Sequence, residues 1–192
     1  MENIIAQRFE EHLELVSAVQ KDQALLAKLA AAAELIRTAL ATGHKLLFCG
    51  NGGSAADAQH WAAEFVGRFQ KERRGLPAIA LTVDTSILTA VANDYGYERV
   101  FSRQVEALGQ PGDVLIGVST SGNSGNVVAA VELAKTRGLK TVSLTGCGGG
   151  KLAQLTDVCL AIPCKVTARV QEVHSLMCHI LCELADEDFK RA

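Results

Sequence analysis

The sequence VLIGVSTSGNS at residues 114–124 decides the fold, because an apolar strand runs directly into a loop of hydroxyl side chains. An uninterrupted apolar run is typical of a strand that is buried on both faces. From Val127 onward the apolar residues recur at helical spacing. A buried strand, a loop and a helix in this order predict one unit of a parallel α/β sheet.

The loop itself is suited to binding phosphate. Ser119, Thr120, Ser121 and Ser124 offer up to four O–H donors, and the free N–H groups of the following helix point at the same place. Capping that helix would need only one such side chain, so an ordinary strand-to-helix turn does not account for the whole set. Because residues 119–124 contain no Lys or Arg, hydroxyl and amide groups would hold the anion.

Composition narrows the class of protein. A length of 192 residues with 48% hydrophobic and 21% charged residues fits one globular domain. A net charge of −2, with one short basic run at 71–74, does not provide the electrostatic footprint of a nucleic-acid-binding protein. The sequence has neither a cationic leader followed by an apolar run nor an apolar stretch of membrane-spanning length. We therefore expect a cytoplasmic protein with a small anionic ligand and neither nucleic acid nor a membrane as partner.

The six cysteines form no CxxC pair and no zinc-ribbon spacing. Cys49 and Cys159 fall within apolar strand patterns, where a free thiol behaves as a small hydrophobic group. We expect buried thiols and no disulfide framework.

The chain divides near residue 43. Residues 3–20 and 23–42 have the spacing of two amphipathic helices outside the alternating pattern, and a partner subunit commonly covers such stripes. From residue 44 onward strands and helices alternate, which predicts a doubly wound α/β fold. We expect a single domain over 1–192, with 1–43 serving oligomerisation and 44–192 forming the core. The predicted core strands are 45–49, 78–81, 113–118, 140–144 and 158–162, and the predicted core helices are about 54–69, 85–93, 96–108, 127–137, 150–155 and 168–188.

The loop after the first strand is rich in glycine. Residues 50–55, GNGGSA, formally match a dinucleotide fingerprint, but Asp84 comes too late to be its acidic partner. We interpret this loop as a tight turn whose amides, together with Asn51, contact a small polyol or phosphate. Ligands of doubly wound folds bind at the carboxyl ends of the strands, and this loop and the serine loop both lie there.

The helix that follows carries His60 and Glu64 at i and i+4, on one face. This spacing allows both side chains to reach one metal ion, or allows Glu64 to act as a base beside His60. A solvated pair on the helix surface is the alternative.

The last helix has two different sides. One side is aliphatic and is expected to face the sheet. The other carries polar and thiol side chains where a solvated face would have Lys and Glu, so we expect it to line a site or a subunit interface. Gln171 and His179 lie about 12 Å apart along the helix and could reach one small ligand only from its two ends. The aliphatic side comprises Val173, Leu176, Met177, Ile180 and Leu184, and the other side Gln171, Ser175, Cys178, His179 and Cys182.

Four separated segments resemble one known family. They are CGNGGSAADAQHWAAE (49–64), AND (92–94), STSGNS (119–124) and QEVHSLMCH (171–179), and they resemble the SIS-domain phosphoheptose isomerases over nearly the whole chain. That family converts sedoheptulose 7-phosphate into D-glycero-D-manno-heptose 7-phosphate, the first step of heptose supply for lipopolysaccharide. The resemblance implies a five-stranded parallel sheet of flavodoxin-like order 2-1-3-4-5 and a homotetramer with active sites between subunits.

The resemblance also implies roles for single residues. Glu64 and His179 would be the catalytic pair that moves a proton through an enediol, chemistry suited to a carboxylate and an imidazole. One zinc ion per subunit could polarise the substrate carbonyl. Whether Glu64 serves as base or as zinc ligand stays open, because a zinc-bound carboxylate is a weaker base. The implied zinc ligands are His60, Glu64, Gln171 and His179, and the implied substrate contacts are Asn51, Gly52, Gly53, Glu64, Asn93, Asp94, Ser119, Thr120, Ser121, Ser124 and Gln171.

One departure and two alternatives accompany this interpretation. Some members of the family have Asp where this sequence has Ala168, before Arg169, so a mechanism that needs a carboxylate there is in doubt for this chain. One alternative is a non-catalytic SIS-domain protein that binds the replication initiator, and the presence of both Glu64 and His179 favours the enzyme over it. The other is an isomerase or sensor of a different sugar phosphate, which the same serine loop would serve equally well.

Overall fold

The sheet at the centre of the chain has the strand order β2-β1-β3-β4-β5, and every neighbouring pair is parallel. This computed structural model describes residues 2–189. The predicted doubly wound fold and strand order are therefore confirmed. The strands are β1 (Leu46–Gly50), β2 (Ala78–Ala80), β3 (Val114–Ser119), β4 (Lys140–Thr145) and β5 (Val158–Ala161). The helices are α1 (Glu2–Lys21), α2 (Gln23–Ala41), α3 (Gly53–Val66), α4 (Thr85–Tyr95), η1 (Tyr97–Arg99, a 3₁₀ turn), α5 (Ser102–Leu108), α6 (Gly125–Thr136), α7 (Leu152–Leu155) and α8 (Thr167–Phe189).

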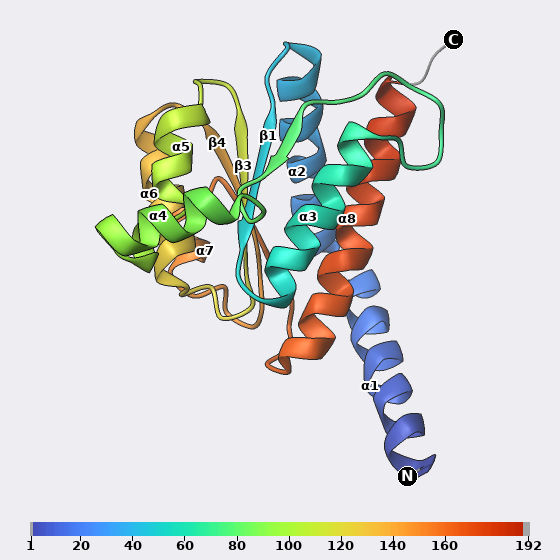
Figure 1. Cartoon of the computed structure of the whole chain (residues 1–192). Coiled ribbons are helices and arrows are strands. Elements are labelled where there is room, and N and C mark those ends of the chain that lie inside the picture. The colour runs from blue at the N-terminus through green and yellow to red at the C-terminus, as the bar shows by residue number, and fades with distance from the viewer. Residues whose placement is uncertain (1, 190–192) are drawn as a thin grey trace.

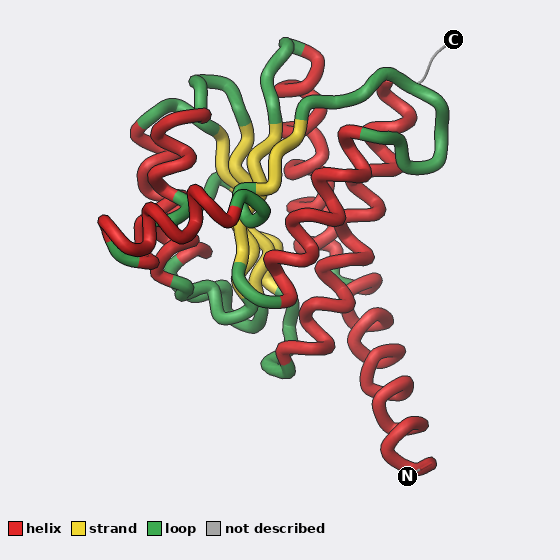
Figure 2. Tube along the Cα trace, in the orientation of Figure 1, coloured by secondary structure: helices red, strands yellow, loops and turns green. Residues whose placement is uncertain are grey.

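Helices cover both faces of the sheet. Helices α2, α3 and α8 lie on one face and α4 to α7 on the other, with the strands between them (Figures 1 and 2). Alternate residues of β1 serve the two layers, since Phe48 packs with α3 and α8 while Leu47 packs with α5 and α6. Burial on both faces is the physical reason that the strands are continuously apolar.

Helix α1 leaves the body of the protein toward its N-terminus (Figure 1). The C-terminal part packs inward through Leu15 and Val19, which are buried. In the N-terminal part, Ile5, Phe9 and Leu13 are 56%, 69% and 67% exposed. The predicted amphipathic helix is therefore present, but the rest of this chain buries only the C-terminal part of its apolar face. None of the helices in residues 2–189 is both long and apolar enough to span a membrane.

The prediction for the apolar side of α8 was partly wrong. Val173 and Met177 are buried as expected, but Leu176 and Leu184 are 40% and 43% exposed. A second set of residues, which includes both cysteines of the predicted site side, is buried instead. The reason is that α8 packs against α1, α2 and α3, so its buried arc is set by three helices. The buried residues of α8 are Val170, Val173, His174, Met177, Cys178, Leu181, Cys182, Ala185 and Asp186.

Helix α3 ends earlier than predicted. The spacing predicts a helix to residue 69, but α3 ends at Val66 and Gly67 is its C-cap. Residues 67–77 then form a loop that passes around the C-terminal part of α8 before β2 begins (Figure 1).

His174 is a fully buried histidine of α8. Its Nε2 atom lies 3.0 Å from the carbonyl oxygen of Thr145 at the end of β4, and Nε2 donates because a carbonyl oxygen only accepts. Nδ1 is buried without a hydrogen-bond partner, so a second ring proton there would be an unpaired buried N–H, which favours the neutral ring. Burial lowers the pKa of His174 to about 4, against 6.5 for an exposed ring, although the bond to Thr145 acts in the opposite direction. In the unfolded chain the ring binds a proton near pH 6.5, whereas the folded protein resists protonation down to about pH 4.

We therefore predict that the contribution of neutral His174 to stability is fully present above pH 6.5 and is lost as the pH falls toward 4. The free energy of unfolding should drop by up to about 3 kcal/mol over this interval through this group alone. Urea unfolding of the parent and of His174→Gln, which keeps an N–H donor for Thr145 but does not titrate, measures the difference. Equal pH slopes for the two proteins would contradict the assignment.

Candidate active site

The serine loop, residues 119–124, lies at the carboxyl end of β3 and is held by its own hydroxyl groups. Ser119 Oγ is 2.9 Å from Ser124 Oγ and 3.4 Å from Ser121 Oγ. Ser124 occupies the N-cap position of α6, but its side chain makes no capping hydrogen bond. The serine hydroxyls thus converge on one another, and the N–H groups of the first turn of α6 receive no side-chain cap. Such an arrangement of donors can accept an anion.

The segment after β4, residues 146–152, packs against the serine loop. Gly122 adopts a φ of +67°, and a Cβ atom there would lie 2.0 Å from the carbonyl oxygen of Gly149. The backbone of Lys151 donates to the Asn123 side chain at 3.0 Å, and the backbone of Leu152 donates to Gly122 at 3.1 Å. The glycine-rich segment 146–150 therefore allows two backbones to touch and fixes the position of the serine loop.

Asn51 joins the two loops at the carboxyl ends of β1 and β3. Its amide exchanges two hydrogen bonds with the amide of Asn126, at 2.9 and 2.8 Å, and its oxygen also accepts from the Tyr97 hydroxyl at 3.2 Å. Asn126 and Tyr97 thus contact a predicted site residue, and neither was predicted from the sequence. A signal was present for Asn126, since an amide two residues after Ser124 falls in the first turn of the helix that follows the loop.

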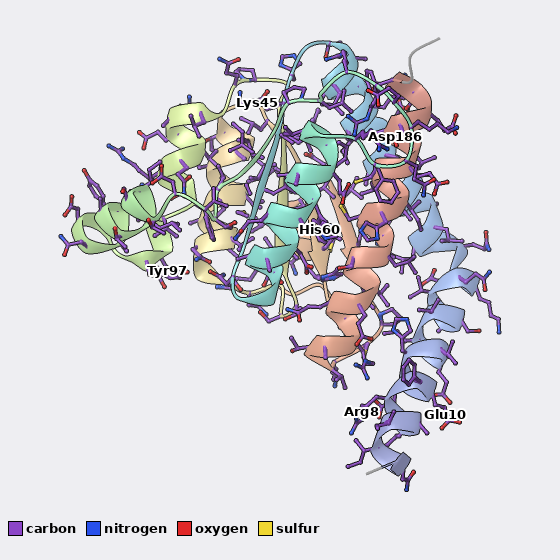
Figure 3. The ribbon with its side chains drawn as sticks, turned by 45° about the vertical axis from the view of Figure 1, so that its right-hand side comes forward. Arg8, Glu10, Lys45, His60, Tyr97 and Asp186 are labelled. Atoms are coloured by element: carbon purple, nitrogen blue, oxygen red, sulfur yellow. The ribbon has the colours of Figure 1, made fainter. Side chains whose placement is uncertain are left out.

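Helices α3 and α8 face one another along their length (Figure 3). At their N-terminal ends the Gln171 amide lies against Gly53, so closely that a Cβ on Gly53 would be 2.6 Å from Gln171 Nε2. Two turns further along, His60 Nε2 is 3.1 Å from Glu64 Oε1, and the His60 ring meets the His179 ring edge-on with centroids 5.2 Å apart. The predicted pair on α3 and His179 on α8 therefore form one cluster, and Gln171 lies apart from it.

Two further polar residues belong to the seam between α3 and α8. Ser175 Oγ donates to Asp57 Oδ1 at 3.2 Å, while the other oxygen of Asp57 is buried without a hydrogen-bond partner. Burial raises the pKa of Asp57, and Ser175 and His60 act against that shift. Asp57 was not predicted from the sequence, although it precedes His60 by three residues and so lies on the same face of α3.

Three further predicted substrate contacts are exposed. Asn93 and Asp94 are exposed near the end of α4. The Asn93 side-chain amide donates to Asp94 Oδ1 at 2.8 Å. Gly52 is the exposed N-cap of α3. Within residues 2–189, no side-chain hydrogen bond links Asn93 or Asp94 to any other predicted site residue. The nearby Tyr97 does bond to Asn51.

The predicted zinc ligands do not form a closed centre. In the part of the chain that the structure describes, no three His, Cys, Asp or Glu side chains are grouped closely enough to hold a metal ion. His60 and Glu64 are bonded to each other, and Gln171 lies against Gly53. The donor types suit zinc, but their present arrangement does not.

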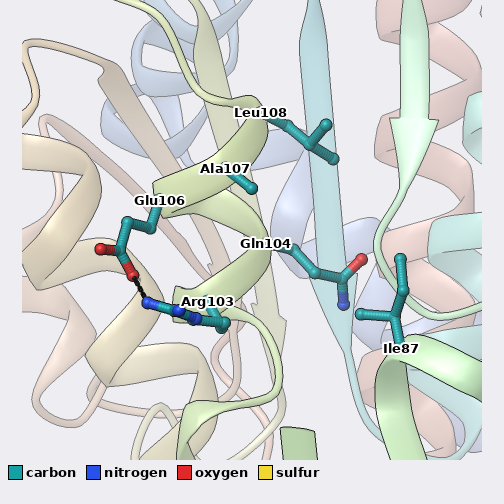
Figure 4. Close-up of a pocket in the computed structure, with 6 residues that line it drawn as sticks. All are labelled: Ile87, Arg103, Gln104, Glu106, Ala107 and Leu108. Carbon is teal, nitrogen blue, oxygen red and sulfur yellow. Dashed lines mark hydrogen bonds and ion pairs between the residues drawn. The ribbon is translucent and has the colours of Figure 1, made fainter. Parts of the chain in front are cut away.

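A separate cavity of about 440 Å³ lies between α4 and α5 (Figure 4). Its polar groups have partners: Arg103 pairs with Glu106 at 2.6 Å, and the Gln104 amide donates to the carbonyl groups of Leu81 and Val100. The remaining lining residues are Ile87, Ala107 and Leu108. This cavity lies on the other face of the sheet from the His60 cluster.

Comparison with known proteins decides the family. The SIS domain model matches residues 8–146. The phosphoheptose isomerase of Roseiflexus sp. is 61% identical over 156 residues, which is 81% of this chain and 79% of that protein. The chain belongs to the phosphoheptose isomerase family of SIS-domain proteins. The phosphoheptose isomerase of Aliarcobacter butzleri is 51% identical over 98% of both chains. The structure of phosphoheptose isomerase from Neisseria gonorrhoeae superposes with a TM-score of 0.91 at 47% identity, covering 97% of this chain and 98% of that one.

For the serine loop of this phosphoheptose isomerase family member we predict that Gly122→Ala is far more destabilising than Gly148→Ala. Both glycines have positive φ, but a Cβ at Gly148 would meet nothing within 4 Å. The Gly148 variant should lose about 1–2 kcal/mol from backbone strain, and the Gly122 variant at least about 2 kcal/mol more from overlap with Gly149. Chemical denaturation measures both, and equal losses would refute the close approach of the two loops.

Proposed function

We infer that this chain is an aldose–ketose isomerase that converts sedoheptulose 7-phosphate into D-glycero-D-manno-heptose 7-phosphate. The observation that carries the inference is that one chain of this family has both a loop of convergent hydroxyls and a carboxylate–imidazole cluster on α3 and α8. An anion site alone would suit a binding protein. The cluster adds the groups that an enediol reaction needs. The product would enter heptose supply for lipopolysaccharide, and we propose a cytoplasmic location for this step.

We propose that the serine loop holds the phosphate group of the substrate. Ser119, Thr120, Ser121 and Ser124 would donate hydroxyl hydrogen bonds, and the first amides of α6 would add backbone donors. Substrate contacts at Asn51, Gly52, Gly53, Asn93, Asp94 and Gln171 are part of the same proposal.

Glu64 and His179 are our proposed catalytic pair. Moving the carbonyl between C2 and C1 requires one group to remove a proton from carbon and a group to return a proton at the neighbouring position. A carboxylate and an imidazole do this near neutral pH. Phe69 stacks on the His179 ring with centroids 5.3 Å apart, which limits the orientations of that ring. The neighbouring Asp57 and Ser175 supply further polar groups along the same seam.

A zinc ion held by His60, Glu64, Gln171 and His179 is a further proposal for this site. When bound, such an ion polarises the substrate carbonyl. Binding would require Glu64 to exchange its hydrogen bond with His60 for the metal and Gln171 to turn away from Gly53. The proton transfers proposed above rest on Glu64 and His179 themselves.

We propose that the complete site forms between subunits of a homotetramer. Glu64 lies eleven residues after Gly53 on α3, which corresponds to about 16 Å along the helix. The ends of β1 and β3 lie side by side, so a small sugar phosphate held by the serine loop would have to span a comparable distance to reach Glu64 of the same chain. The exposed apolar residues of α1 and an apolar groove lined by Val19, Leu29 and Met177 among others support burial against a partner subunit.

The first test is conversion of sedoheptulose 7-phosphate by the purified protein, followed by NMR with and without added zinc. The parent should convert it, while Glu64→Gln and His179→Asn should lose at least about 100-fold in kcat because each removes a proton-transfer group. Light scattering checks that the variants keep the parent's oligomeric state. No conversion by a folded parent under either metal condition would refute the isomerase.

A second test addresses the phosphate. Ser121→Ala and Ser124→Ala should each weaken substrate binding by about 1.5–3 kcal/mol, because each removes a hydroxyl donor to a charged group. Ser86→Ala, an exposed hydroxyl at the start of α4, is the control. Titration calorimetry with the catalytically inactive Glu64→Gln protein measures the affinities, and unchanged affinity in both loop variants would remove the phosphate assignment.

A further inference from the structure

A buried ion pair joins the loop after α3 to the C-terminal part of α8. Arg73 Nε is 2.6 Å from Asp186 Oδ1, and the two side chains are 0% and 1% exposed. The second carboxylate oxygen of Asp186 accepts from the backbone N–H groups of Gln70 and Lys71. Asp186 thereby holds the loop at three points.

The guanidinium group of Arg73 also caps the end of α3. Its Nη2 atom donates to the carbonyl oxygen of Glu64 at 2.7 Å, and its Nη1 atom donates to the carbonyls of Phe65 and Gly67 at 2.9 and 3.2 Å. Carbonyl groups in the last turn of a helix have no partner within the helix, and a cation there is also favoured by the helix dipole. These bonds satisfy carbonyl groups at the end of α3 and so allow the helix to end at Val66, before the predicted boundary.

Stability alone is a weak explanation for such a pair. Burying two charges costs several kcal/mol in desolvation, and well-packed apolar residues often replace a buried pair without loss. What an apolar pair could not do is hold the backbone carbonyl of Glu64 in a fixed place relative to α8.

The ion pair links the segments that carry the two proposed catalytic residues, Glu64 near the end of α3 and His179 on α8. Arg73 bonds directly to the backbone of Glu64, whose carboxylate lies against His60. Asp186 follows His179 by seven residues, two turns of the same rigid helix or about 10 Å. Figure 3 shows His60 in the middle of the seam and Asp186 toward the C-terminal end of α8.

We propose that Arg73 and Asp186 are positioning residues, which set the place of the Glu64 carboxylate against the His179 ring. The proposal rests on the proposed isomerase function. Neither residue touches substrate. The serine loop lies beyond the opposite end of α3, so the ion pair should govern turnover and leave phosphate binding alone. A displacement of about 1 Å in a catalytic group can cost about 100-fold in rate.

The test is Arg73→Lys, which keeps the charge but replaces the planar fork of donors by one ammonium group. We expect kcat to fall about 10–100-fold while KM for sedoheptulose 7-phosphate stays within about twofold. Lys71→Gln is the matched control, because its side chain joins the same two segments through an exposed ion pair with Glu187. The control should retain the parent's kcat. An unchanged kcat in a folded Arg73→Lys protein would overturn the proposal.

A double variant distinguishes a positioning role of Arg73 from a merely structural one. Glu64→Asp already misplaces the carboxylate, so adding Arg73→Lys should lower kcat by a much smaller factor than it does in the parent. The same factor in both backgrounds would mean that Arg73 does not act through Glu64. If Arg73→Lys does not fold, Asp186→Asn serves in the same comparisons, because it keeps the size of the side chain and one acceptor oxygen.

A crystal structure of the variant provides a readout that does not depend on activity. The Glu64 carboxylate should shift relative to His179 while residues 119–124 stay in place. Glu64 in its original position would overturn the proposal even if the parent protein had no isomerase activity. A parent without activity but a variant with a displaced Glu64 would refute the function and leave the positioning intact.

Discussion

The adjacency of β1 and β3 is the constraint on which the site depends. The helices that follow these two strands lie on opposite faces of the sheet, α3 on one and α6 on the other. The two connecting loops therefore diverge at the carboxyl ends of neighbouring strands, and a crevice forms there in every fold of this type. In this chain the amides of Asn51 and Asn126 bridge that crevice, so the glycine turn and the serine loop form one rigid edge.

Packing between α3 and α8 brings together the other residues of the candidate site. Both helices press apolar residues into the same core, including Trp61 and Met177, and they leave a narrow polar seam along one side. Asp57, Ser175, His60 and His179 occupy this seam. Since helices with interlocked cores cannot slide freely, side chains of the seam keep their spacing. The ion pair of Arg73 and Asp186 joins the loop after α3 to the C-terminal part of α8 at one end of this seam.

The separation between the serine loop and the α3–α8 seam bears on how subunits would assemble. Glu64 lies eleven residues after Gly53, the first residue of α3, whereas the serine loop follows β3, and this separation is one ground for our proposal that the site is completed by a partner subunit. The apolar residues left exposed on α1 indicate where the rest of the surface would be covered. Apolar surface that one chain leaves uncovered is a common basis for obligate oligomers, and it agrees with the shared site that we propose.

The sequence by itself determined the strands, most of the helices, their order and the hydroxyl-rich composition of the serine loop. Local signals were enough for this, because hydrophobic period, glycine turns and the i,i+4 spacing of His60 and Glu64 depend only on near neighbours in the chain. The single helix predicted at 96–108 is instead the 3₁₀ turn η1 followed by α5. Tertiary structure alone decided which distant residues meet. Asn51 and Asn126 are 75 residues apart and Arg73 and Asp186 are 113 apart, and no local period encodes either pairing. Which residues of α8 are buried could not be predicted from its sequence either, because the helix packs against α1, α2 and α3, and the positions of these helices set its buried face.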